Sequence, residues 1–90
     1  MVYIVSYDLV NQRNYPRLQA SIEKYNTVRV LLSVWLVQTQ LSALELATDL
    51  VNSIDNDDRI LVAELTHNTA WRGLMTIDSN MQQWVAAAAR

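Results

Sequence analysis

The residue of this sequence best suited to metal chemistry is Asp8, which ends an apolar segment near the N-terminus. A carboxylate at a strand end can reach a cleft lined by loops, and carboxylate oxygens are ligands that Mg²⁺ prefers. One carboxylate alone makes a poor metal site, but a two-fold axis would bring Asp8 of two subunits together. The alternative is that Asp8 caps the turn after the strand. Asp8 is therefore the candidate catalytic and metal-binding residue, with a structural role as the alternative.

Arginine side chains near the first predicted helix could bind phosphate. Arg13 and Arg17 are four residues apart, which places them on one helix face, and Arg29 could lie nearby. A guanidinium group donates paired hydrogen bonds to phosphate oxygens. The alternative, which the sequence favours, is an ordinary solvated helix face.

The motif Trp71-Arg72-Gly73 contains the single glycine of the chain. Glycine permits a turn that other residues avoid. Trp71 could stack on a nucleobase, and Arg72 could contact phosphate or a partner. The alternative is that Trp71 anchors the C-terminal segment to the core or to a second subunit. His67, the one histidine, could act as a general base, but no partner stands at a diagnostic spacing.

Several reaction classes are excluded by residue type. The chain has no Cys and one His, which excludes disulfides, zinc–thiolate sites, cysteine nucleophiles and His-rich metal sites. The serines lack the context of a nucleophile elbow. Asp55, Asp57 and Asp58 have the composition of a metal loop, but their spacing does not match an EF-hand. A solvated turn is expected there.

Three segments of the sequence have the character of strands or strand pairs. In residues 2–8, Tyr3, Val5 and Tyr7 fall on one face, and Asp8 falls on the other. Residues 28–39 are rich in valine and divide into two strands near Ser33. A further strand covers residues 60–65.

Helices are predicted between these strands and after the last one. Asn14 can cap the first, whose apolar stripe continues to Tyr25. Ser42 and Glu45 form a capping box at the start of the second. The alanine-rich segment 77–90 favours a final helix by its intrinsic propensity.

This order of elements predicts an α+β fold. Right-handed crossovers place both internal helices on one face of a four-stranded antiparallel sheet, the ferredoxin-like βαββαβ arrangement. Residues 1–90 are expected to form a single domain, with residues 77–90 as a C-terminal helical extension. The other sheet face would still carry apolar side chains, and we expect a homodimer to cover them.

Composition limits the partners. The formal net charge is −2, whereas nucleic-acid binders usually carry a basic excess, so tight nucleic-acid binding is disfavoured. Hydrophobic residues make up 51% of the chain, which leaves apolar surface for a protein or small-ligand partner. No apolar run approaches the roughly 18 residues of a membrane span, and no secretion signal is present. A cytoplasmic protein without membrane contact is expected.

Several of these motifs, taken in order, resemble the CRISPR-associated protein-two superfamily of small ferredoxin-like dimers. The resemblance rests on two strand motifs, Tyr3-Ile4-Val5-Ser6-Tyr7-Asp8-Leu9 and Ser33-Val34-Trp35-Leu36-Val37. The match is closer to the SinR-like branch, which comprises small proteins of bacteria and phages. The motifs of that branch are Leu41-Ser42-Ala43, the Trp-x-Gly of Trp71-Arg72-Gly73, and Trp84 in a C-terminal helix.

The resemblance implies a dimer and, in some members, metal-dependent cleavage of RNA or DNA. The metal-linked residue of the superfamily is the strand-end Asp, which matches Asp8. Other members act as scaffolds or binding proteins without nuclease activity. The first hypothesis is thus a homodimer of nuclease ancestry that mainly binds or scaffolds, in phage–host defence or counter-defence, without a required cofactor. The second is an endonuclease in which paired Asp8 carboxylates hold Mg²⁺ and Arg13 or Arg17 steadies the phosphate. The acidic net charge favours the first.

Overall fold

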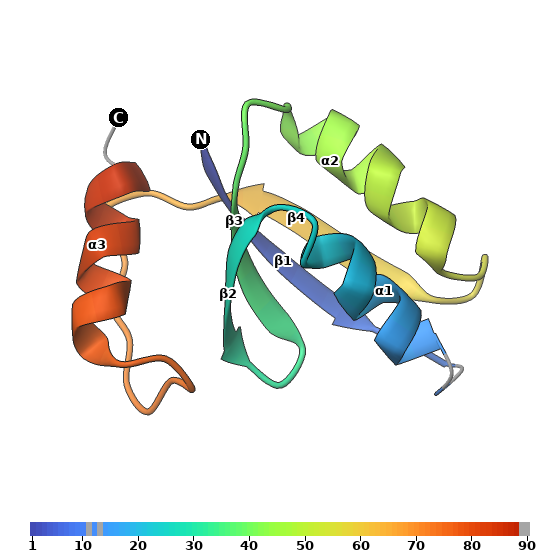
Figure 1. The fold of residues 1–90 in the computed structure, drawn as a ribbon, viewed down its shortest axis with the longest axis horizontal. Coiled ribbons are helices and arrows are strands. Elements are labelled where there is room, and N and C mark those ends of the chain that lie inside the picture. The colour runs from blue at the N-terminus through green and yellow to red at the C-terminus, as the bar shows by residue number, and fades with distance from the viewer. Residues whose placement is uncertain (11, 13, 89–90) are drawn as a thin grey trace.

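The computed structural model describes residues 1–10, 12 and 14–88. The elements in these residues are β1 (Val2–Asp8), α1 (Asn14–Ile22), β2 (Asn26–Leu31), β3 (Val34–Gln38), α2 (Ala43–Leu50), a 3-10 turn (Val51–Ser53), β4 (Arg59–Glu64) and α3 (Asp78–Ala88). The strands form one antiparallel sheet in the order β2-β3-β1-β4 (Figure 1). This is the predicted α+β, ferredoxin-like βαββαβ arrangement with a C-terminal helix.

The inner position of β1 follows from its side-chain pattern. β1 pairs with β3 on one side and with β4 on the other. Tyr3, Val5 and Tyr7 belong to the core cluster under α1 and α2, whereas Val2 and Ile4 belong to a cluster on the opposite face. A strand that is apolar on both sides must have both faces covered. The predicted alternation along this strand is confirmed.

The helices α1 and α2 together cover one face of the sheet (Figure 1). Their fully buried apolar side chains are Leu18, Ile22, Leu46 and Leu50. The predicted capping box starts α2: the Ser42 hydroxyl accepts a hydrogen bond from the Glu45 N–H, and the Glu45 carboxylate accepts one from the Ser42 N–H. Two backbone donors that the helix cannot satisfy are thereby satisfied locally.

The first helix is shorter than its apolar stripe predicts, because it ends at Ile22 and the chain turns before Tyr25. The Tyr25 hydroxyl donates a short hydrogen bond to the Asp49 carboxylate of α2. This bond, together with burial and the negative charge of Asp49, raises the pKa of Tyr25 to about 12. Tyr25 therefore does not extend α1. Its hydrogen bond attaches the segment between α1 and β2 to α2.

The valine-rich segment divides into β2 and β3 at Leu32 and Ser33, as predicted. The register of the pair shifts between Arg29 and Leu31. The Arg29 guanidinium donates to the Leu32 carbonyl, and its central carbon lies 5.6 Å from the centre of the Trp35 ring. These contacts hold a hairpin turn that lacks the Asn-Gly or Asp-Gly sequence of the commonest tight turns.

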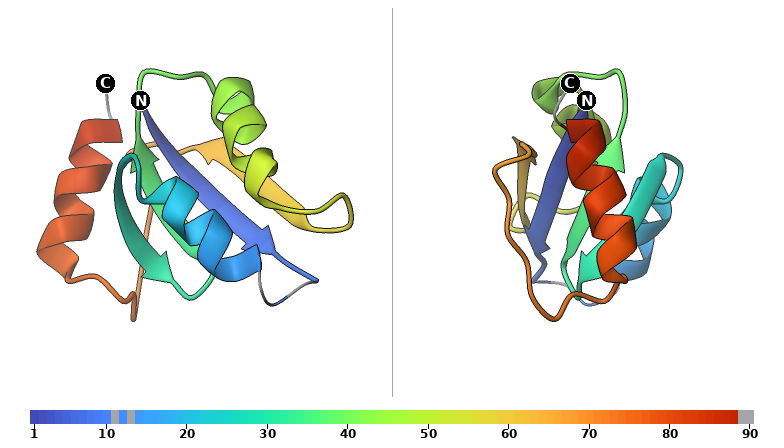
Figure 2. Two further views of the ribbon diagram at one scale, coloured as in Figure 1. Left: turned by 45° about the vertical axis from the view of Figure 1, so that its right-hand side comes forward. Right: turned by 90° about the vertical axis from the view of Figure 1, so that its left-hand side faces the viewer.

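The helix α3 covers part of the second face of the sheet, on the side away from α1 and α2 (Figure 2). Met81 is buried there, and Trp84 packs against the same cluster. The loop before α3 runs beside β2, where the Met75 N–H donates to the Val30 carbonyl at 2.9 Å. Near β4 this face stays open, and Leu61 is 64% exposed. None of the helices in the described ranges is long and apolar enough to span a membrane.

Candidate functional site

Asp8 is the last residue of β1, and its side chain is 78% exposed. Its partner in the β1–β4 ladder is Arg59, the first residue of β4. Asp8 Oδ2 and Arg59 Nη1 lie 4.0 Å apart. Because the Arg59 side chain is also 82% exposed, water screens the pair and it adds little to stability. The pair does affect the electrostatics of the site, because the positive charge of Arg59 offsets the negative charge of the Asp8 carboxylate.

A shallow hollow of about 210 Å³ lies beside this pair. It is lined by residues of β1 and β4, among them Ser6, Asp8, Arg59 and Leu61, which alternation places on the second face of the sheet. The hydroxyl, the carboxylate and the guanidinium offer polar contacts, and Leu61 offers an apolar one. The hollow can therefore hold a small polar group against a partly apolar surface.

The residues around Asp8 in the single chain do not fit a magnesium ion. Mg²⁺ needs near-octahedral oxygen ligation, whereas Asp8 supplies one carboxylate beside the cation of Arg59. In the described part of the chain, one group of acidic side chains is close enough to hold a metal together, and it consists of Asp55, Asp57 and Asp58. Asp8 does not belong to that group.

The acidic turn before β4 is more ordered than the solvated turn predicted from its composition. Asp58 accepts hydrogen bonds from the Val10 N–H at 2.7 Å, from the Asn14 amide at 2.8 Å and from the Asp55 N–H at 2.8 Å. The Asn14 amide also donates to the Asp55 carboxylate at 2.9 Å. Asn14 is fully buried. These carboxylates therefore connect the segment after β1 to the turn before β4.

The predicted phosphate-binding arginines lie in different surroundings. Arg17 is exposed, and its guanidinium donates to the Asn14 side-chain oxygen at 3.2 Å. Arg29 is half-buried at the β2–β3 hairpin, over the Trp35 ring. Arg13 lies outside the described residues. Within the described residues no hydrogen bond or ion pair joins Arg17 or Arg29 to Asp8.

The motif Trp71-Arg72-Gly73 lies in the loop between β4 and α3. Trp71 is half-buried and packs against the second-face cluster, which favours the anchoring role over stacking on a base. Gly73 has φ +69°, a backbone angle that side-chain-bearing residues rarely adopt, so the predicted turn is confirmed. Arg72 and His67 are both exposed, and neither lines the hollow beside Asp8.

The hydroxyl groups of two tyrosines on β1 are used inside the protein. The Tyr7 oxygen accepts a buried hydrogen bond from the Trp35 indole N–H at 2.9 Å. The Tyr3 hydroxyl donates to the Leu41 carbonyl at 2.7 Å. Burial, followed by the nearby negative charge of Glu64, raises the pKa of Tyr3. Both tyrosine hydroxyls therefore make structural contacts between β1 and other segments of the chain.

Sequence reasoning missed a polar pair at the opposite end of the sheet from Asp8. Asn26, the first residue of β2, and Gln38, the last residue of β3, are ladder partners, and the Asn26 amide donates to the Gln38 carbonyl at 2.8 Å. A hollow beside them is also lined by Trp84 of α3. The available signal was an amide residue near each end of the valine-rich segment. Only the strand register shows that the two meet.

The fold and the strand-end carboxylate define a small ferredoxin-like α+β protein with one candidate acidic site on its first strand. The chain belongs to the Cas2 family, because the family model described as CRISPR associated protein Cas2 matches residues 1–72. The match runs from β1 through Trp71 and Arg72 and leaves α3 outside. Membership places the chain among CRISPR-associated proteins of nuclease ancestry. No solved structure matches the chain.

Proposed function

We propose that this protein is a homodimeric member of the Cas2 family that binds or scaffolds other molecules without cleaving nucleic acid. Its place would be the cytoplasm, in phage–host defence or counter-defence. The support for the SinR-like branch is the ordered motif set Leu41-Ser42-Ala43, Trp71-x-Gly73 and Trp84. Residues 1–90 would act as one domain, with residues 77–90 as its helical extension.

The observation that carries this proposal is the cation opposite the candidate catalytic carboxylate. Arg59 is the ladder partner of Asp8, and the two charged groups lie 4.0 Å apart. If a two-fold axis brought both Asp8 carboxylates together, each would bring its own Arg59. The positive and negative charges would then balance, so a divalent cation would gain little electrostatic attraction. The pair is better suited to contacting a partner than to holding a metal.

The expected dimer is supported by the uneven covering of the second sheet face. The helix α3 packs over the cluster that contains Val2, Val30 and Leu36. Near β4, Leu61 is 64% exposed on the same face, and β4 is an edge strand. Edge strands and open apolar faces favour association with another chain. A second copy of the protein would cover this region.

A metal-dependent endonuclease is the second candidate function, and the exposure of Asp8 favours it. A side chain that is 78% exposed at a strand end can reach a substrate or an ion shared with a second subunit. In this alternative Arg17, which is exposed one turn into α1, would contact the phosphate. The two functions differ in whether Asp8 is essential for a reaction.

A cleavage assay separates the two functions. The dimer, verified by light scattering, would be incubated with labelled single- and double-stranded RNA and DNA and with Mg²⁺ or Mn²⁺. Three proteins would be compared: the parent, Asp8→Asn and Asp57→Asn. Asp57 is an exposed carboxylate of the acidic turn and serves as the matched control. We expect no metal-dependent cleavage by any of the three.

Cleavage by the parent and by Asp57→Asn, but not by Asp8→Asn, would overturn the proposal and assign Asp8 to catalysis. Cleavage that persists in Asp8→Asn and co-elutes with the dimer would overturn the proposal and exclude Asp8 as the catalytic residue, whereas cleavage that separates from the dimer would indicate a contaminating nuclease. An inactive parent that is a monomer in solution would contradict the dimer and leave only the binding role.

A further inference from the structure

The β1–β4 side of the second sheet face carries six side chains in a regular array. Along β1, alternation places Ile4, Ser6 and Asp8 on this face, since Ile4 belongs to the second-face cluster. Their ladder partners on β4 lie beside them on the same face, and all three partners are exposed. We call these six residues the open face, and they form three rows across the strands: Ile4 with Ala63, Ser6 with Leu61, and Asp8 with Arg59.

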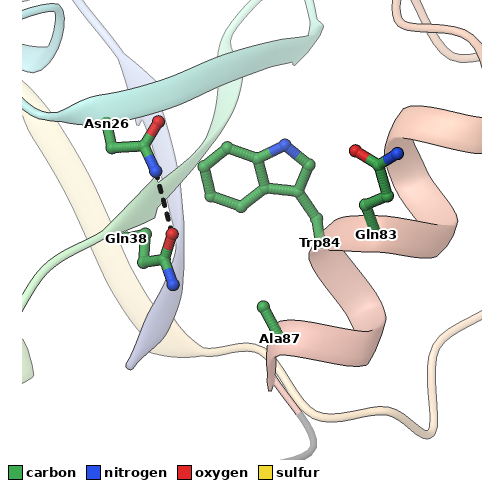
Figure 3. A pocket seen from close by; sticks show the side chains of 5 residues that line it. All are labelled: Asn26, Gln38, Gln83, Trp84 and Ala87. Atoms are coloured by element: carbon green, nitrogen blue, oxygen red, sulfur yellow. Dashed lines mark hydrogen bonds between the residues drawn. The ribbon is translucent and has the colours of Figure 1, made fainter.

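The helix α3 limits how a partner can approach the open face, because it lies over the β2–β3 side of the same sheet face (Figure 2). Figure 3 shows the Trp84 indole extending from α3 toward Asn26 and Gln38, at the paired ends of β2 and β3. A partner on the open face must therefore present a surface that stops short of α3. A second copy offers such a surface, since its own sheet ends at the edge strand β4.

Two identical faces that pack against each other are related by a two-fold axis in the plane between them. An axis that runs across the strands would place Asp8 opposite the partner's Asp8 or the partner's Ile4. Either position is unfavourable, because like charges meet or a charge lies on an apolar side chain. Both α3 helices would also lie on the same side of the dimer and crowd each other. An axis that runs along the strands instead places each α3 beside the β4 edge of the partner subunit.

An axis along the strands, midway between β1 and β4, places each residue of a row opposite the partner's copy of its ladder neighbour. In the charged row, Asp8 then faces the partner's Arg59, and Arg59 faces the partner's Asp8. Within one subunit, Asp8 Oδ2 and Arg59 Nη1 are 4.0 Å apart, which is longer than a hydrogen bond. Both side chains are exposed, so each keeps hydrogen-bonding capacity for the second subunit.

The other two rows are complementary in volume under the same axis. Leu61, which is 64% exposed, faces the partner's Ser6, which is smaller, and Ile4 faces the partner's Ala63. A large side chain opposite a small one in each row allows two packed sheets to interdigitate. The open face is therefore complementary to a second copy of itself in both charge and volume.

We propose that two copies of the protein pack through their open faces about an axis along the strands, with Asp8 of each subunit paired to the partner's Arg59. This pairing rests on the proposed function, which requires a homodimer, and it adds the direction of the axis and the contacts that fix it. Each carboxylate then lies between two guanidinium groups, its own neighbour and the partner's Arg59. The two Asp8 carboxylates are thereby separated by cations instead of sharing a metal ion.

Charge reversal tests the pairing between subunits. In Asp8→Arg cations face cations across the interface, and in Arg59→Asp anions face anions. Each variant alone should therefore dimerise about tenfold more weakly than the parent. In an equal mixture, one subunit contributes both cations and the other contributes both anions, so native mass spectrometry should find heterodimers above their statistical share. The charges within each subunit are the same in homodimer and heterodimer, so this excess reports contacts between subunits.

Glu23→Arg and Lys24→Asp are the matched control pair, because both residues are exposed and follow α1 on the other side of the sheet. These variants change the net charge by the same amounts as the reversals at Asp8 and Arg59. Each should dimerise like the parent, and their mixture should give the statistical share of heterodimers. An equal excess of heterodimer in both mixtures would overturn the pairing, since net charge alone would then account for it.

The double variant Asp8→Arg/Arg59→Asp restores opposite charges in each pair and should regain the dimerisation of the parent. Circular dichroism verifies the fold of every variant, which should be intact because both side chains are exposed. A double variant that stays weak, or single variants that dimerise like the parent, would overturn the pairing and leave the proposed homodimer standing. A parent that is monomeric in solution would contradict the homodimer itself, and the pairing with it.

Discussion

At the residue scale, the surroundings of each carboxylate determine what it can do. Asp58 accepts hydrogen bonds from the Val10 N–H and the Asn14 amide, and Asp49 accepts one from the Tyr25 hydroxyl. Asp8 is exposed and faces a single cation. The first two therefore hold segments of the chain together, and Asp8 is open to contact from outside. The same residue type serves structure in two places and, in the proposed function, recognition in a third.

The hydrogen bond of Tyr25 to Asp49 predicts a dependence of stability on alkaline pH. The pKa of Tyr25 is raised from 10.0 to about 12 in the folded protein, which therefore holds this proton more tightly than the unfolded chain. The advantage of the parent over Tyr25→Phe should be full below pH 10 and should be lost as the pH rises to about 12. The measurement is urea denaturation of both proteins across this range.

The matched control for this series is Tyr15→Phe, because Tyr15 is also half-buried and its hydroxyl contacts the Leu9 backbone at 3.3 and 3.4 Å. Tyr15→Phe keeps the Tyr25–Asp49 hydrogen bond, so it should keep the loss of stability that this bond causes between pH 10 and about 12. A constant difference between the parent and Tyr25→Phe at every pH would show that the Tyr25 proton is not held by Asp49.

The part of the site that sequence could predict is the part that depends on a single segment. Asp8 was identified because strand alternation and the end of the apolar run are local features. Its neighbour Arg59 was not, because the pairing depends on the register between β1 and β4, which are separated by two strands and two helices in the chain. The Asn26–Gln38 pair could not be predicted for the same reason, because it depends on the register between β2 and β3. Contacts between distant segments require the sheet itself.

At the element scale, local signals predicted most of the fold. The capping box at Ser42 and the alternation in β1 each match one structural period, so they placed α2 and the inner strand. The apolar stripe of α1 overestimated the length of the helix, because Tyr25 is half-buried through a turn toward Asp49 and not through a further helical turn. The packing of α3 could not be predicted, since an apolar face with Met81 and Trp84 could pack on the chain's own sheet or on a second subunit.

The attachment of α3 to the sheet depends mainly on Met81, which is 3% exposed in the second-face cluster. Met81→Ala should lower the free energy of unfolding by about 2–5 kcal/mol, because it removes buried methylene groups and leaves a cavity. Met75→Ala is the matched control, since that side chain is 56% exposed and its backbone N–H bond to Val30 would remain. Urea denaturation measures both. Equal effects of the two changes would show that α3 is not held by this contact.

At the scale of the whole molecule, the sheet is covered on its two faces to different extents. The helices α1 and α2 cover the first face, and α3 covers the β2–β3 side of the second (Figure 2). The β4 side of that second face carries Leu61, the polar pair Asp8–Arg59 and an unpaired strand edge. An apolar residue framed by charges beside an open edge is the composition of a protein interface.

This uneven covering predicts that Leu61→Asp converts the proposed dimer to a monomer. The Leu61 side chain is 64% exposed, so the substitution should leave the fold intact while placing a charge inside the proposed interface. Leu44→Asp is the matched control, because Leu44 is 76% exposed on α2, on the other side of the sheet. Light scattering gives the mass of each variant, and circular dichroism verifies the fold. A folded Leu61→Asp dimer would place the interface elsewhere, and dissociation of both variants would indicate that added negative charge alone separates the subunits.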